Sequence, residues 1–206
     1  MNETVFIVDD DADVRDALSL LLETSGYAVK TFPGAQAFLD FIKPEQQGCI
    51  ILDVHMPSID GPSLQEELQR RDIRLPVIFL SAFSNIPVTV RTIKAGAIDF
   101  LTKPVDGNQL LDRIEAAFAI SRQIHARSMA DQSLAEGISK LTLREKEIMI
   151  IAAAGYSSKE IGRSLGISHR TVEVHRAHVM QKTGAASLLE LARIVDDAKA
   201  TNLLPS

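Results

Sequence analysis

The stretch Val5-Phe-Ile-Val-Asp-Asp-Asp-Ala-Asp13 joins four apolar residues directly to a cluster of carboxylates. Four consecutive apolar residues are typical of a strand that is buried on both faces of a parallel sheet. Carboxylates crowded at the end of such a strand repel one another, and a bound cation relieves that repulsion. The segment therefore predicts a parallel sheet with a cation site at the end of its first strand.

Four further β-prone runs follow in the first half of the chain, at 27–32, 49–52, 76–80 and 97–101. Between them lie segments with apolar residues at helical spacing, and Gly26, Gly48 and Gly96 are expected to end helices. Strands that alternate with helices indicate a parallel sheet covered on both faces, with right-handed crossovers. We therefore expect one α/β domain of doubly wound (βα)₅ type.

The amino-acid composition is that of a globular protein with a hydrophobic core. Of 206 residues, 46% are hydrophobic. No apolar run reaches the ~20 residues that cross a membrane, and the N-terminal residues lack the basic and apolar segments of a secretion signal. The single cysteine, Cys49, excludes an internal disulfide. These features predict a cytoplasmic protein with no membrane partner.

Charge divides the chain into two parts. Residues 1–124 contain 11 Lys and Arg against 18 Asp and Glu, a net charge of −7. Residues 125–206 contain 11 against 9, a net charge of +2. An acidic first part and a basic second part predict two modules that bind different partners.

The second part of the chain has a helical pattern throughout. From Leu110 there is no Pro or Gly before Gly137, which indicates a long helix or helical linker. Thr142 with Glu145 forms a capping-box pattern, and serines at 157 or 158, 168 and 187 are expected to begin further helices. We predict domains at 1–121 and 139–206, joined by a helical linker at 122–138.

Polar residues follow four of the predicted strands. They are Asp9 and Asp10 after the first, Asp53 after the third, Ser81 after the fourth and Lys103 after the fifth. Because ligands bind at the carboxyl ends of the strands in an open parallel sheet, we expect these groups to lie together. Such carboxylates suit Mg²⁺, and one of them can attack phosphorus to form an acyl phosphate. The pattern predicts a site for phosphoryl transfer.

This arrangement resembles the receiver domain of two-component response regulators, a flavodoxin-like (βα)₅ fold. The likeness rests on the acidic pair after the first strand, on Asp53-Val-His-Met-Pro57, on Ser81-Ala82 and on Lys103-Pro104. It implies that Asp53 is the phosphoacceptor and that the Lys103–Pro104 peptide is cis. It also implies a set of supporting roles: Asp9, Asp10, Asp53 and the backbone carbonyl of His55 for Mg²⁺, Ser81 and Lys103 for the phosphoryl oxygens, and Phe100 as the aromatic switch residue.

Simpler roles stay open for several of these residues. Asp11 and Asp13 suit capping of the first helix rather than metal binding. Phe100 at a strand end is equally suited to the core. His55 could be taken for a metal ligand or a phosphohistidine, although the motif needs only its backbone oxygen.

A second resemblance covers the basic module. Two capped helices separated by Gly166 indicate a helix-turn-helix, and the sequence from Leu141 to Gly184 resembles the LuxR-type output domain of the NarL/FixJ subfamily. A four-helix DNA-binding domain is therefore expected. The resemblance implies contacts to base edges by Glu173, Val174, Arg176 and Ala177, and to the DNA backbone by Lys159, Arg170, Thr171, His175 and Lys182.

Other roles are open for this module too. A short basic helical domain could be a protein-docking bundle. His169, His175 and His178 share a helix, but no cysteine or carboxylate completes a tetrahedral zinc site. In the last helix, Leu188, Leu189, Leu191 and Ile194 are expected to belong mostly to the core, and part of that face is expected to pair two output domains on DNA.

Together, the two resemblances predict a transcription regulator of NarL/FixJ type rather than an enzyme, with at most weak self-phosphorylation and autodephosphorylation. A sensor histidine kinase would phosphorylate Asp53, and the face formed by 86–102 would then pair two receivers. The expected partners are the kinase, double-stranded promoter DNA, a second copy of the chain and RNA polymerase.

Two alternatives remain. A haloacid-dehalogenase phosphotransferase would carry its nucleophile after the first strand in a D-x-D frame and a cap insertion. A phosphate-independent scaffold would show no Mg²⁺-dependent dimer after treatment with acetyl phosphate.

Overall fold

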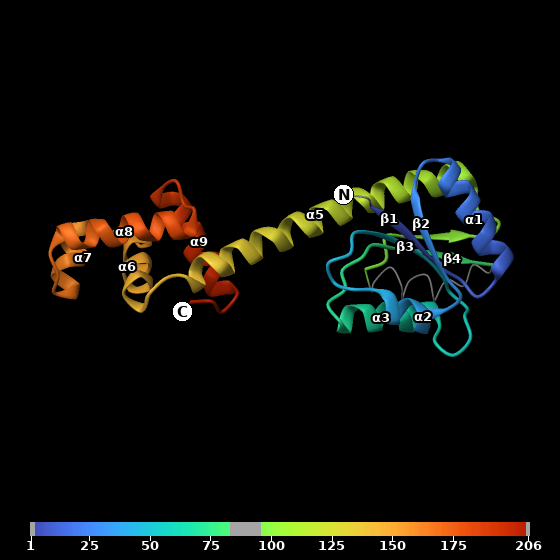
Figure 1. The fold of residues 1–206 in the computed structure, drawn as a ribbon, viewed down its shortest axis with the longest axis horizontal. Coiled ribbons are helices and arrows are strands. Elements are labelled where there is room, and N and C mark those ends of the chain that lie inside the picture. The colour runs from blue at the N-terminus through green and yellow to red at the C-terminus, as the bar shows by residue number, and fades with distance from the viewer. Residues whose placement is uncertain (1–2, 83–95, 205–206) are drawn as a thin grey trace. The chain divides into compact units, whose positions relative to one another are not determined.

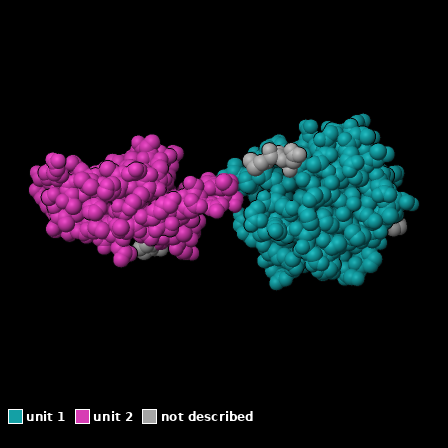
Figure 2. All heavy atoms as spheres, in the orientation of Figure 1, with its two compact units in different colours: residues 1–126 teal, residues 127–206 magenta. Residues whose placement is uncertain are grey.

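A computed structural model describes residues 3–82 and 96–204 of the chain. The chain forms two compact units, Met1–Ala126 and Arg127–Ser206 (Figure 2). Helix α5, Gly107–Ser139, begins in the first unit and ends in the second, which confirms the expected long helix. The predicted domain limits at 121/122 and 138/139 stay predictions. No helix of the described ranges is long and apolar enough to span a membrane.

The first unit is built on a five-stranded parallel sheet within the described residues. Each of the five β-prone runs overlaps one strand, so the sequence prediction is confirmed. The strands are ordered β2-β1-β3-β4-β5, which places the switch in strand order between β1 and β3. Their bounds are β1 Thr4–Val8, β2 Ala28–Phe32, β3 Gly48–Asp53, β4 Val77–Ser81 and β5 Asp99–Thr102.

Helices cover both faces of this sheet (Figure 1). Helices α1, Ala12–Thr24, and α5 lie on one face, and α2, Ala35–Phe41, and α3, Gly61–Arg70, lie on the other. The strands are apolar without a break because both faces are buried. In β1, Phe6 and Val8 pack with α2 and α3, whereas Val5 and Ile7 pack with α1 and α5.

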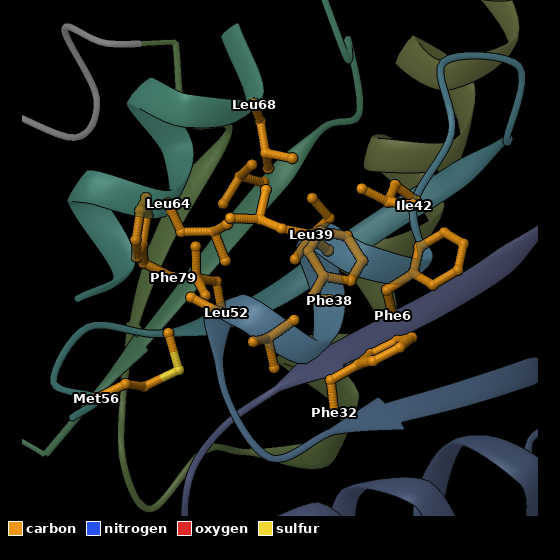
Figure 3. Close-up of a cluster of buried hydrophobic side chains, with 14 of the residues drawn as sticks. Phe6, Phe32, Phe38, Leu39, Ile42, Leu52, Met56, Leu64, Leu68 and Phe79 are labelled. Carbon is orange, nitrogen blue, oxygen red and sulfur yellow. The ribbon is translucent and has the colours of Figure 1, made fainter. Parts of the chain in front are cut away.

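The core on the α2 and α3 side is rich in aromatic rings (Figure 3). Phe32 and Phe38 meet edge to face with ring centroids 5.2 Å apart, and Phe6 lies 5.7 Å from Phe38. Such pairs stabilise a core beyond the area that they bury. This packing fixes the strand ends from which the polar residues emerge.

The prediction that Gly48 ends a helix is wrong, because Gly48 is the first residue of β3. Its φ is 141°, and a Cβ at this position would lie 1.9 Å from the carbonyl oxygen of Thr4 on β1. The close approach of two neighbouring strands, rather than the end of a helix, requires glycine here. Gly26, in contrast, follows the last turn of α1 with φ 90°, as expected.

In the second unit, four helices follow α5 within residues 140–204. The capping box of Thr142 and Glu145 is present at the start of α6, and Gly166 ends α7 in the left-handed conformation that separates it from α8. Apolar side chains from all four helices and the end of α5 form one core, which includes Ile148, Val172 and Leu191. The helices are α6 Leu143–Ala153, α7 Ser158–Leu165, α8 His169–Thr183 and α9 Leu188–Ala200.

Candidate functional site

Two carboxylates lie on either side of the switch in strand order. Asp9 follows β1 directly, and Asp53 is the last residue of β3. Both are buried, with exposed fractions of 2% and 7%. Their position follows from the parallel order of the strands, because β1 and β3 are paired in register and end at the same edge.

Lys103 joins these two carboxylates. Its Nζ lies 2.6 Å from Asp9 Oδ2 and 2.6 Å from Asp53 Oδ1. Backbone N–H groups satisfy the other oxygens, since Asp11 donates to Asp9 Oδ1 at 3.0 Å and His55 donates to Asp53 Oδ2 at 2.7 Å. One ammonium between two carboxylates leaves the group with net negative charge, which favours the approach of a further cation.

Burial and ion pairing act in opposite directions on the pKa values of this group. Burial raises the pKa of the Asp9 carboxyl above its ordinary value, although hydrogen bonds from Lys103 and from the backbone of Asp11 act against it. Burial alone would lower the pKa of Lys103, but hydrogen bonds to Asp53 and Asp9 outweigh it and raise that pKa. The lysine is therefore held in its charged form.

The other residues predicted for this site, Ser81, Asp10 and His55, differ in burial and in contacts. Ser81 is buried, and its backbone carbonyl accepts a hydrogen bond from Lys103 N at 2.7 Å. Asp10 and His55 have exposed side chains, and no hydrogen bond or ion pair within the described ranges joins Asp10 to the other two carboxylates. The Lys103–Pro104 peptide is cis, as the receiver resemblance implied.

The contacts of Asp11 and Phe100 test the simpler roles left open above, helix capping for Asp11 and core packing for Phe100. The side chain of Asp11 accepts hydrogen bonds from the backbone of Asp13 and Val14 and caps α1, which confirms the capping role. The ring of Phe100 stacks on Phe79 with centroids 6.4 Å apart and is half-buried against the core. Phe100 is thus packed as a core residue at the sheet edge, and its role as a switch stays a prediction.

The donor chemistry of the pocket fits a hard divalent ion. Every side-chain acceptor in it is a carboxylate or hydroxyl oxygen, the type of ligand that Mg²⁺ prefers. In the described residues, however, no group of three or more His, Cys, Asp or Glu is gathered closely enough to hold a metal. The structure brings Asp9 and Asp53 together, and the expected convergence of a third carboxylate, Asp10, is not shown.

In the second unit, α8 presents an exposed surface opposite its buried residues. Val172 and Val179 face the core, whereas the exposed residues recur at helical spacing. His175 and Arg176 are half-buried at the margins of this surface, and Lys159 is exposed on α7. The exposed residues of α8 predicted to contact DNA are Arg170, Thr171, Glu173, Val174 and Ala177.

Two cations of α8 are bound within the unit. Lys182 Nζ donates to both carboxylate oxygens of Glu145, at 2.9 Å and 2.7 Å, and Arg176 Nη1 donates to Ser158 Oγ at 3.0 Å. Glu145 is only 3% exposed. The hydrogen bond from Lys182, with that from the Thr142 backbone, lowers the pKa of Glu145 to about 2. These contacts fix α8 against α6 and α7.

Each of the two units matches a known protein family. Residues 5–115 match the response regulator receiver domain, and residues 139–195 match the bacterial regulatory proteins of the luxR family. The protein is a two-component response regulator. Its receiver and its helix-turn-helix unit make it a DNA-binding regulator of transcription, and proteins with this pair of domains are typically transcription factors rather than enzymes.

Relatives of this response regulator match over nearly its whole length. The transcriptional regulatory protein TdiR of Thauera aromatica is 42% identical over 192 residues, which are 93% of this chain and 85% of TdiR. FixJ of Bradyrhizobium diazoefficiens is 37% identical over 96% of this chain and 97% of FixJ. The solved structure of the response regulator StyR has a TM-score of 0.86 at 42% identity, and covers 96% of this chain and 100% of StyR.

Sequence reasoning missed two residues that shape the pocket of the response regulator. A Cβ on Gly61 would lie 2.3 Å from the backbone oxygen of Asp53 and 2.9 Å from the ring of Phe79. Arg15 Nη1 donates to the backbone oxygen of Asp9 at 2.8 Å. The Asp60-Gly61-Pro62 sequence gives a signal for a helix start, but it does not reveal the contact with Asp53.

Proposed function

We propose that this response regulator is switched by phosphorylation of Asp53 by a sensor histidine kinase. The observation that carries the proposal is the placement of the Asp53 carboxylate, at the end of β3 and 2.6 Å from the ammonium of Lys103. A carboxylate that is held at the switch in strand order and paired with a fixed cation is suited to accept a phosphoryl group.

The transfer follows from the contacts of Asp53. The hydrogen bond from His55 N to Oδ2 fixes the orientation of the carboxylate. One carboxylate oxygen forms a bond to phosphorus while the bond between phosphorus and the histidine nitrogen of the kinase breaks, and that histidine leaves with its electron pair. Lys103 then exchanges its contact with the carboxylate for a contact with a phosphoryl oxygen, and Ser81 donates to another.

Asp9, Asp10, Asp53 and the backbone carbonyl of His55 would hold Mg²⁺ beside the acceptor. When bound, the ion neutralises charge on the phosphoryl group in transfer. The buried, net-negative pair of Asp9 and Asp53 supports this assignment. The same pocket allows slow hydrolysis of the acyl phosphate, with water as the acceptor.

Phosphorylation would then favour pairing of two chains. Loss of the contact between Lys103 and Asp53 would allow the edge beside Phe100 to repack. The expected pairing face is 86–102. Only residues 96–102 of this face are described by the structure, and 86–95 lie outside the described residues. In the output unit, Leu191 of α9 is buried as expected, but Leu188 and Leu189 are exposed, the latter at 69%, so the expectation that they belong to the core is wrong. These two exposed residues support a second pairing surface.

In the resulting homodimer, α8 of each copy would enter the major groove of promoter DNA at half-sites about one helical turn apart. Glu173, Val174, Arg176 and Ala177 would face base edges. Lys159, Arg170, Thr171, His175 and Lys182 would contact the DNA backbone. Lys182 has one ammonium hydrogen left for this contact, because its two hydrogen bonds to Glu145 use the others. RNA polymerase is the expected partner at the promoter.

The proposal is tested with the full chain, acetyl phosphate and Mg²⁺. The wild type should gain the mass of one phosphoryl group and form a dimer, and beryllofluoride should give the same dimer. Asp53→Asn should lose both responses and keep its melting temperature, while Asp112→Asn, an exposed carboxylate on α5, should behave as the wild type. A full phosphoryl adduct on Asp53→Asn would show that another residue is the acceptor.

The same experiment separates the two alternatives. A phosphotransferase of the haloacid-dehalogenase class would carry its adduct on Asp9, and Asp9→Asn rather than Asp53→Asn would abolish it. A phosphate-independent scaffold would give neither adduct nor dimer with any of these reagents.

A further inference from the structure

The exposed surface of α8 has a carboxylate at its centre. Arg170, Glu173, Val174 and Ala177 recur at helical spacing and are all exposed. We call these four residues the reading stripe. Val174 is 50% exposed, and Glu173 forms no hydrogen bond or ion pair with any residue that the structure describes. An unpaired acid on a helix that binds a polyanion requires an explanation.

The neighbouring arginines do not pair with Glu173. Arg170 lies one turn before Glu173 and is also exposed, but no ion pair joins the two within the described residues. Arg176, one turn after Glu173, donates to Ser158 on α7 instead. A carboxylate without such a partner is repelled by DNA phosphates, so it weakens binding unless it accepts hydrogen bonds from the bases.

Resting on the proposed binding to DNA, we infer that Glu173 is a specificity residue that selects cytosine at one position of each half-site. In the major groove only cytosine N4 and adenine N6 offer amino donors, whereas guanine and thymine present acceptors that would repel a carboxylate. Adenine also presents the N7 acceptor beside its amino group, but cytosine does not. Cytosine is therefore the base that matches a carboxylate.

Val174 and Ala177 complete the inferred contact surface. Both are apolar, and they lie one position and four positions along α8 from Glu173. Apolar side chains in the major groove favour the methyl group of thymine. The reading stripe therefore predicts a half-site with cytosine opposite Glu173 and thymine beside it.

The test is selection of binding sites from a random duplex library by the full chain, phosphorylated with acetyl phosphate and Mg²⁺. The wild type should enrich cytosine at one half-site position by about tenfold over the other bases. Glu173→Gln should shift the preference at that position to adenine, because glutamine can donate to N7 and accept from N6. Glu173→Ala should remove the preference, and Val174→Ala should reduce enrichment of the adjacent thymine.

Asp196→Asn is the matched control, because it removes the same charge from an exposed position of α9. Any general gain in affinity from the lost negative charge should appear in this variant too, without a change in base preference. Unaltered melting temperatures show that all variants are folded.

The results separate the inference from the proposed function. If the wild type binds DNA but Glu173→Gln and Glu173→Ala select the same bases as the wild type at every position, the inference is overturned and DNA binding stands. If the phosphorylated wild type retains no DNA at low salt, both are overturned.

Discussion

In the receiver pocket, two buried carboxylates share the ammonium of Lys103 at 2.6 Å, whereas on α8 the carboxylate of Glu173 is exposed and has no partner in the described part of the chain. The pocket must hold like charges close together until a phosphoryl group arrives, so internal pairing stabilises it. The reading stripe must leave its polar groups unpaired, because DNA supplies their partners. The ion pairs of Lys103 thus support the receiver structure, whereas the carboxylate of Glu173, which is unpaired within the described residues, is available to a ligand.

Removing Lys103 should have the largest effect on stability. Lys103→Met leaves Asp9 and Asp53 buried without their shared cation, and should lower the free energy of unfolding by about 3 kcal/mol at neutral pH without divalent ions. Added Mg²⁺ should recover much of this loss, since an ion that binds only the folded state stabilises it. Chemical denaturation with and without Mg²⁺ measures both effects.

Lys43→Met is the control, since this lysine is exposed in the same unit. It should change stability by less than about 0.5 kcal/mol. If Lys103→Met were no more destabilising than Lys43→Met, the pairing seen in the pocket would contribute nothing to stability.

Breaking the ion pair between Lys182 and Glu145 should lower the free energy of unfolding by less than the loss of Lys103 does. Lys182→Met removes two hydrogen bonds to a buried carboxylate and should lower the free energy of unfolding by about 2 kcal/mol. The loss is smaller than for Lys103 because the Lys182 side chain is one-third exposed. Thermal denaturation monitored by circular dichroism measures it, and Glu145→Gln should give a comparable loss.

The same pair predicts a pH dependence. The pKa of Glu145 falls from its ordinary 4.5 to about 2 in the folded protein. The stability that this carboxylate contributes is therefore fully present above pH 4.5 and is lost as the pH falls toward 2. Glu145→Gln should lack this component of the acid denaturation curve. A curve identical in shape to that of the wild type would contradict the lowered pKa.

Lys159→Ala should have the smallest effect on stability, because this lysine is exposed and has no internal partner within the described ranges. It should weaken binding to all DNA sequences alike and reduce the salt slope by about 1. Binding titrations at several salt concentrations measure this slope, with Lys43→Ala in the receiver as the control. An unchanged slope would show that Lys159 does not reach a phosphate.

Much of the fold was predictable from local patterns. Continuous apolar runs such as Val5–Val8 indicated strands buried on both faces, and the capping box of Thr142 and Glu145 marked the start of α6. The grouping of Asp9, Asp53 and Lys103 was also predictable, because parallel strands end at one edge. Gly48 was misread, because a glycine that allows two strands to approach has the same local signal as one that ends a helix.

By itself, the sequence determined the strands and helices, the residues at the strand ends and the two families that they resemble. These features depend on periodicity and on side-chain chemistry, which the order of residues contains. Only the tertiary structure decided which charges are paired. Glu145 and Lys182 meet across α6 and α8, and Arg176 reaches Ser158 on α7, while Glu173 is left without a partner among the described residues. Pairing depends on distances between helices that are far apart in the chain, and no local pattern specifies them.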